Sequence, residues 1–167
     1  MIEYLLCIAT GLLAKLADGS GKPAAILAGF LYGLSGGFLA TRSQAFATVA
    51  FGLVAGELAA GKVDELGHYA AVFAFIAAVA FLGFVQPSYA VLAALVSLAF
   101  ADEFLHDKTA GAKGVLGFVA AHRLLSDLGA LLLSIFTGEW VYFAAVACFD
   151  FGYQGFELIG SRFRVRK

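Results

Sequence analysis

The feature that most constrains this chain is a succession of apolar stretches joined by very short connections. Seven stretches are separated by Gly, Pro or charged residues, at about residues 2–17, 23–41, 44–60, 68–85, 88–105, 115–136 and 139–160. A helix that crosses the hydrocarbon core of a bilayer needs about 20 apolar residues. Because lipid-exposed irregular backbone is not tolerated inside the hydrocarbon, each stretch is expected to form a helix.

The composition favours a membrane protein over a water-soluble domain. The chain is 62% hydrophobic and 14% charged, with a mean hydropathy of +0.90, whereas a soluble domain has about 25% charged residues. Seven spans would use roughly 140 residues and leave no room for a soluble domain. We therefore predict an all-α polytopic membrane protein, a compact bundle of seven transmembrane helices that forms a single integral membrane domain over residues 1–167.

The basic residues predict the orientation of this bundle. Arg42 is the single basic residue in the second, fourth and sixth connections and the N-terminus, and Arg123 lies within the sixth stretch. The other nine of the 11 basic residues lie in the first, third and fifth connections and the C-terminal tail: Lys15, Lys22, Lys62, Lys108, Lys113, Arg162, Arg164, Arg166 and Lys167. Because Lys and Arg accumulate on the cytoplasmic side, we predict a multi-pass protein of the cell membrane with its N-terminus outside and its C-terminus in the cytosol. Six spans, with the fourth and fifth stretches merged at Pro87, are the alternative.

Glycine rows predict close helix packing. Gly29, Gly33 and Gly37 recur at every fourth position of the second stretch, and Gly52 and Gly56 do so in the third. Such rows let helix backbones approach closely in a membrane. We interpret them as contacts within the bundle, and a homo-oligomer interface through these glycine-rich faces is the alternative.

Ionisable residues in the last two stretches form the first candidate site. At about 1.5 Å per residue, Asp127 and Asp150 fall near the bilayer centre, and Arg123 lies one turn closer to the cytosol. An ionised side chain at this depth costs free energy, so an ionisable residue found there is a functional candidate by default. Arg123 and Asp127 can pair four residues apart, which leaves Asp150 to share Arg123 or to be protonated. His122 and Glu157 extend the polar stripe, so the catalytic candidates are Arg123, Asp127, Asp150, His122 and Glu157. The alternative is that these residues only hold the two helices together.

A second group of residues indicates a metal site at the cytosolic side. Glu-x-x-His spacing occurs twice, at Glu65–His68 and Glu103–His106, and helix bundles use this spacing to bring a carboxylate and an imidazole to one metal. The candidate ligands are Asp102, Glu103, His106, Asp107, Glu65 and His68. Carboxylates favour Mg²⁺, and imidazole favours Zn²⁺ or Mn²⁺. Charges that only anchor the helix ends at the water interface are the alternative.

These patterns favour an enzyme without identifying its reaction. The formal net charge of −1 excludes a nucleic-acid partner on electrostatic grounds. A cytosol-facing polar site with a divalent metal suits a lipid-modifying enzyme that acts on a lipid or isoprenoid phosphate, with membrane lipids as its surroundings. A small proton- or cation-coupled transporter or channel is the main alternative, and a non-catalytic membrane subunit is the third.

Overall fold

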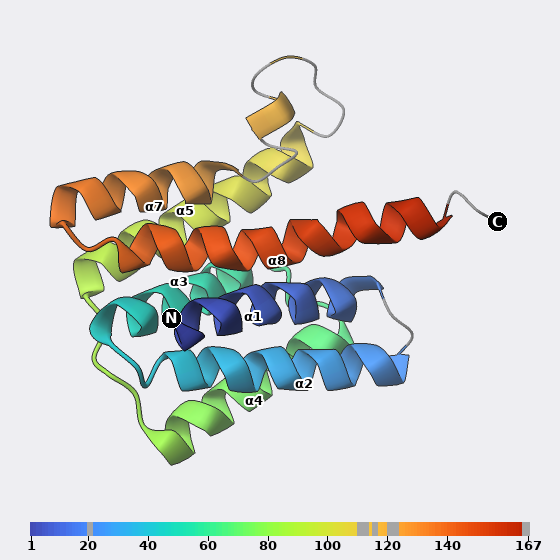
Figure 1. Ribbon diagram of the computed structural model, residues 1–167, viewed down its shortest axis with the longest axis horizontal. Coiled ribbons are helices and arrows are strands. Elements are labelled where there is room, and N and C mark those ends of the chain that lie inside the picture. Colours follow the sequence, from blue (N-terminus) through green and yellow to red (C-terminus); the bar gives the residue numbers. More distant parts are fainter. Residues whose placement is uncertain (20–21, 110–113, 115–116, 120–123, 165–167) are drawn as a thin grey trace.

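The chain folds into a bundle of helices in which each helix runs roughly opposite to the one before it in the sequence (Figure 1). The computed structural model describes residues 1–19, 22–109, 114, 117–119 and 124–164. The described residues contain no strand. Their main helices are α1 (Ile2–Gly19), α2 (Lys22–Leu39), α3 (Gln44–Ala59), α4 (Leu66–Leu82), α5 (Tyr89–Lys108), α7 (Leu124–Thr137) and α8 (Val141–Arg164). A short helical segment at residues 117–119 precedes α7.

The helix boundaries follow the predicted stretches and reject the merged alternative. α4 ends at Gly83, whose φ of 78° lies in the left-handed region that favours glycine. Residues 83–88 are not helical, and the N–H of Val85 donates to the carbonyl of Ala40 at 2.9 Å. The helical segments on the two sides of Pro87 are therefore separate, and the arrangement with a single merged helix was wrong. For the sixth stretch, α7 covers the part from residue 124 onward.

Three helix pairs pack with their backbones almost in contact. A methyl group added at Gly29 or Gly33 of α2 would fall on the carbonyl oxygen of Gly67 or Ala71 in α4. A methyl group added at Gly56 of α3 would fall on the Cβ of Ala99 in α5. The predicted glycine rows therefore pack inside the chain, as rows of small residues do between membrane helices. In the α1–α8 pair, Gly11 and Gly152 allow the same close backbone approach, and the glycine rows did not predict this contact.

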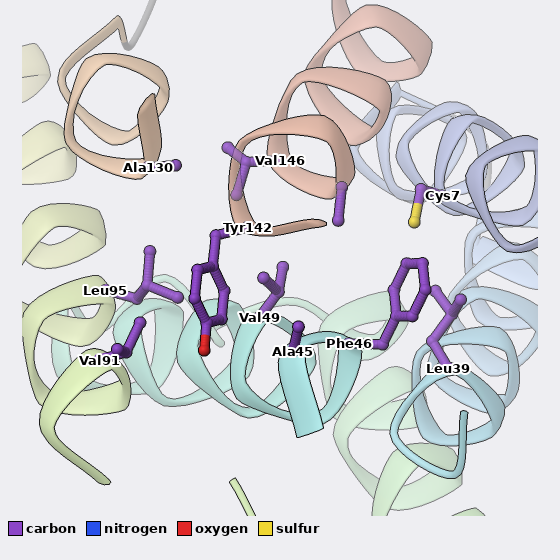
Figure 2. Close-up of a cluster of buried hydrophobic side chains, with 11 residues drawn as sticks. Cys7, Leu39, Ala45, Phe46, Val49, Val91, Leu95, Ala130, Tyr142 and Val146 are labelled. Atoms are coloured by element: carbon purple, nitrogen blue, oxygen red, sulfur yellow. The ribbon is translucent and has the colours of Figure 1, made fainter. Parts of the chain in front are cut away.

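The apolar core lies at the end of the bundle away from the basic connections. Figure 2 shows side chains from α1, α2, α3, α5, α7 and α8 that meet there, with Phe46, Tyr142 and Val146 among them. Val146 is 2% exposed, and Phe46 lies within van der Waals reach of Tyr4, with ring centroids 5.6 Å apart. The van der Waals contacts among these packed side chains help to hold the helices together at this end.

The outer surface of the bundle is also apolar. Phe81 is 90% exposed and Phe136 is 84% exposed, and other large apolar side chains face outward along most helices. Among the described residues, one helix, Tyr89–Lys108, is by itself long and apolar enough to cross a membrane. A single helix of this kind does not establish a membrane protein, because the core helix of a soluble bundle can have the same length and composition.

Candidate functional site

A cavity of about 700 Å³ lies between the helices, and α1, α2, α3, α4, α5, α7 and α8 all contribute to its wall. At one end its lining belongs to the apolar core, with Cys7, Leu39 and Phe46. At the other end the lining reaches Asp64 and Glu65, which are exposed. The cavity therefore extends from the core to the surface at the connection between α3 and α4.

The described lining carries a large excess of acidic groups. Lys15 and Lys62 are its lysines, and His68 and His106 are its histidines. Seven acidic residues also line it: Asp18, Glu57, Asp64, Glu65, Asp102, Glu103 and Asp150. The described part of the cavity wall therefore carries more acidic than basic side chains. A low-dielectric cleft lined with one sign of charge concentrates ions of the opposite sign.

Asp18 joins three helices at the polar end of the cavity. Its Oδ1 lies 2.8 Å from Nε2 of His68 in α4, and its Oδ2 accepts a hydrogen bond of 2.5 Å from the hydroxyl of Tyr153 in α8. Nζ of Lys15 lies 4.5 Å from the centroid of the Tyr153 ring. Burial opposes ionisation of Asp18, but the hydrogen bonds from His68 and Tyr153, with Lys15 nearby, outweigh burial and hold the pKa of Asp18 below its ordinary value.

This network predicts a pH-dependent contribution of Asp18 to stability. Because the pKa of Asp18 is lower in the folded chain, ionised Asp18 stabilises the fold above its ordinary value of 3.8, and this contribution is lost as pH falls through the depressed value. We expect wild-type protein to melt at a higher temperature than Asp18→Asn at neutral pH, and the difference to shrink on acidification below 3.8. Thermal melts of both proteins in detergent would measure it. Asp64→Asn, at an exposed neighbouring acid, is the control, and a difference that is constant with pH would contradict the prediction.

Lys62 ties the α3–α4 connection to α5. Its Nζ lies 2.9 Å from Oδ1 of Asp107 and 3.4 Å from Oε2 of Glu103, a side chain that is 4% exposed. The hydrogen bond to Asp107, helped by the nearby Glu103 charge, raises the pKa of Lys62. Lys62 therefore stays charged and partly neutralises the Glu103–Asp107 end of the cavity.

Asp102 binds the start of α7. Oδ1 of Asp102 accepts the N–H of Leu125 at 3.1 Å, and Oδ2 accepts the N–H of Ser126 at 2.6 Å. These donors belong to the first turn of α7, where backbone N–H groups lack partners within the helix. The carboxylate therefore acts as a helix cap supplied by α5, and its negative charge is favourable at a helix N-terminus.

The carboxyl groups of Asp127 in α7 and Asp150 in α8 lie close enough to interact. Oδ1 of Asp127 is buried and has no hydrogen-bond partner in the described part of the chain. The structure thus brings together the two aspartates that the sequence placed at the same depth.

The predicted metal ligands are separated in the part of the chain that the structure describes. His68 faces Asp18, while Glu65 is exposed and Asp107 pairs with Lys62. Asp102, Glu103, His106, Glu65 and His68 all line the cavity, but no three His, Cys, Asp or Glu side chains of the described residues are grouped as a metal ion would require. Metal binding stays a prediction. His122 and Arg123 lie outside the described residues, and Glu157 lies on α8 in a part whose side chains the structure does not describe.

Sequence reasoning did not include three residues that line the cavity among the candidate site residues: Asp18, Glu57 and Tyr153. Tyr153 could have been found, because it lies three residues after Asp150 and therefore on the same helix face. Asp18 gives a weaker signal, since an acid at a helix end is ordinary loop chemistry. Only its contacts with α4 and α8 distinguish it.

Comparison with known proteins gives no further guide to the site. No family model matches this chain, and neither the curated proteins nor the solved structures contain a significant match.

Proposed function

We propose that this chain is a multi-pass membrane carrier whose cavity binds a cation from the cytosolic side. The observation that supports it most directly is the excess of carboxylates in the described lining, seven against two lysines. A closed apolar core at one end and an acidic opening at the other are what a carrier needs in a state that faces one side of the membrane.

The membrane arrangement in this proposal rests on the surface and on the helix lengths. The 17 residues of α4 reach the lower limit of a span, which is about 17–25 residues, and α5 has 20. The exposed phenylalanines would then face lipid, where apolar surface is favourable. The basic residues gather at the connections beside the acidic opening, so we propose that this opening faces the cytosol.

The lipid-phosphate enzyme fits the described lining less well. A phosphate group would meet an excess of carboxylates in the cavity unless a divalent cation neutralised them. Asp102, one of the predicted ligands, already accepts two backbone N–H groups. A cation carrier uses the same acidic field directly, and for this reason we prefer it.

Flux into proteoliposomes tests the carrier. We expect the purified protein to accelerate entry of at least one of three probe cations, rubidium, magnesium and tetraethylammonium, above that of empty liposomes. Asp150→Asn removes an acid that lines the cavity, and we expect it to lower the flux about tenfold or more, because interactions with a charged group contribute about 1.5–3 kcal/mol.

The matched control is Glu139→Gln. Glu139 is an acid at the opposite end of the bundle, where its Oε1 accepts the N–H of Val141 at 3.2 Å, and the glutamine keeps an acceptor. We expect this variant to transport as the wild type does. Equal flux through Asp150→Asn and wild type, or no flux of any probe above empty liposomes, would overturn the carrier.

A further inference from the structure

We infer that the cation is a lipophilic organic onium ion, such as an alkyl- or arylammonium, and this inference rests on the carrier proposed above. The first observation is size. The cavity volume of about 700 Å³ lies within the range of about 300–1,000 Å³ that small-molecule sites occupy. A bare metal ion would leave most of this space without contacts, whereas an organic cation would fill it.

Aromatic rings form the second observation. Five of them line the cavity: Tyr32, Phe46, Phe75, Phe149 and Tyr153. The face of an aromatic ring attracts a cation within about 6 Å of its centroid, and recognition of quaternary ammonium groups uses this attraction. Rings from α2, α3, α4 and α8 therefore give the wall apolar contact area, and we expect a ring whose face reaches the cavity to attract a soft cation.

The fold already places one ammonium group on such a ring. Nζ of Lys15 lies 4.5 Å from the centroid of Tyr153, and the hydroxyl of the same tyrosine donates to Oδ2 of Asp18. The ring thus has an ammonium on its face and a carboxylate at its hydroxyl. An ammonium ligand in the cavity would meet the same chemistry that the protein uses for its own lysine.

The carboxylates are not arranged as the shell of an inorganic ion. Both oxygens of Asp18 and both oxygens of Asp102 already accept hydrogen bonds, and Glu103 faces Lys62. A Ca²⁺ ion takes six to eight oxygen ligands, and the described residues group no three candidate ligands. An onium ion needs only a negative field and apolar walls, because it forms no coordinate bonds.

The distribution of the lining residues also predicts the orientation of the ligand. Carboxylates such as Asp18 and Glu57 lie near the helix ends at the connections with the basic residues, and Phe46 and Val49 belong to the apolar core. The charged centre of the ligand would lie among the acids, and its apolar groups would point toward the core. Tyr32 and Glu57, on α2 and α3, are the side chains that we select to test this placement.

Equilibrium dialysis with matched probes tests the substrate class. Tetraphenylphosphonium and tetraphenylborate have nearly the same shape and opposite charge, and rubidium represents inorganic cations. With empty micelles as background, we expect the wild type to bind one tetraphenylphosphonium per chain and no tetraphenylborate. We expect Tyr32→Leu and the near-isosteric Glu57→Gln each to weaken binding about tenfold. Tyr89→Leu is the matched control, because Tyr89 is exposed and does not line the cavity.

The outcomes separate this inference from the carrier itself. Loss of binding in Tyr32→Leu and Glu57→Gln, with Tyr89→Leu unchanged and melting temperatures that show folded protein, supports the organic cation. If rubidium or magnesium enters proteoliposomes in an Asp150-dependent way while tetraphenylphosphonium does not bind, the substrate class is wrong and the carrier stands. Equal binding of the phosphonium and the borate overturns the class as well. Absence of both binding and flux overturns both proposals.

Discussion

Alanine at Gly33 is expected to destabilise the bundle by about 3 kcal/mol or more. The added methyl group would fall on the carbonyl oxygen of Ala71 and close to its carbon and Cα atoms. These are backbone atoms of α4, so no side-chain rotation can relieve the overlap, and the two helices must separate. Separation would remove the close contact along the whole α2–α4 pair, where Gly29 approaches Gly67 in the same way.

Gly36→Ala is the control for this substitution. Gly36 lies one turn further along the same helix, and a Cβ there would meet only the ring of Phe75, at 3.4 Å. Both variants gain helix propensity of about 1 kcal/mol, so the difference between them isolates the overlap with α4. Melting temperatures and monodispersity in detergent measure it. Two variants of equal stability would show that α2 and α4 are not in close contact.

The all-helical fold and most of the helix positions could be predicted from sequence because the breaks between the helices are local. Gly83 with its positive φ, and Pro87 shortly after it, stop the chain between α4 and α5 whatever the rest of the fold does. The glycine rows were also readable, because four-residue spacing places small residues on one helix face. The helix that packs against each row could not be predicted, since nothing in α2 itself indicates that α4 lies against it.

The α1–α8 contact illustrates the limit of this reasoning. A methyl group at Gly11 would fall on the carbonyl oxygen of Phe149, and one at Gly152 on that of Ile8. Each is an isolated close approach in its helix. A single glycine in an apolar stretch is common, so only the arrangement of the helices in space identifies this pair.

The candidate site was predicted in position and not in detail. Counting basic residues placed most acids and all three histidines toward one end of the bundle, and the acidic end of the cavity agrees with that polarity. The partners depend on contacts between residues far apart in sequence. His68 is three residues from Glu65 but bonds to Asp18, 50 residues away. The short Glu65–His68 spacing therefore did not identify the partner of His68.

Asp102→Ala is expected to cost about 2–4 kcal/mol, because two backbone N–H groups at the start of α7 lose their acceptor. Asp102 is 3% exposed, so water cannot readily replace the carboxylate. Detachment of the α7 N-terminus would also disturb Ser126, which lines the cavity, and Asp127, which lies close to Asp150. We therefore expect this variant to lose both thermal stability and cation binding.

Asp107→Asn separates this capping role from a simple loss of charge. Asp107 lies on the same helix and pairs with Lys62, but its side chain is 59% exposed. An exposed pair contributes only about 0–1 kcal/mol, so Asp107→Asn should melt close to the wild type. The metal-ligand interpretation of Asp102 makes a different forecast, namely that a chelator such as EDTA lowers the melting temperature of the wild type to that of Asp102→Ala. If the cap is the main role, EDTA leaves the wild-type melting temperature unchanged, because backbone N–H groups and not a metal ion hold the carboxylate.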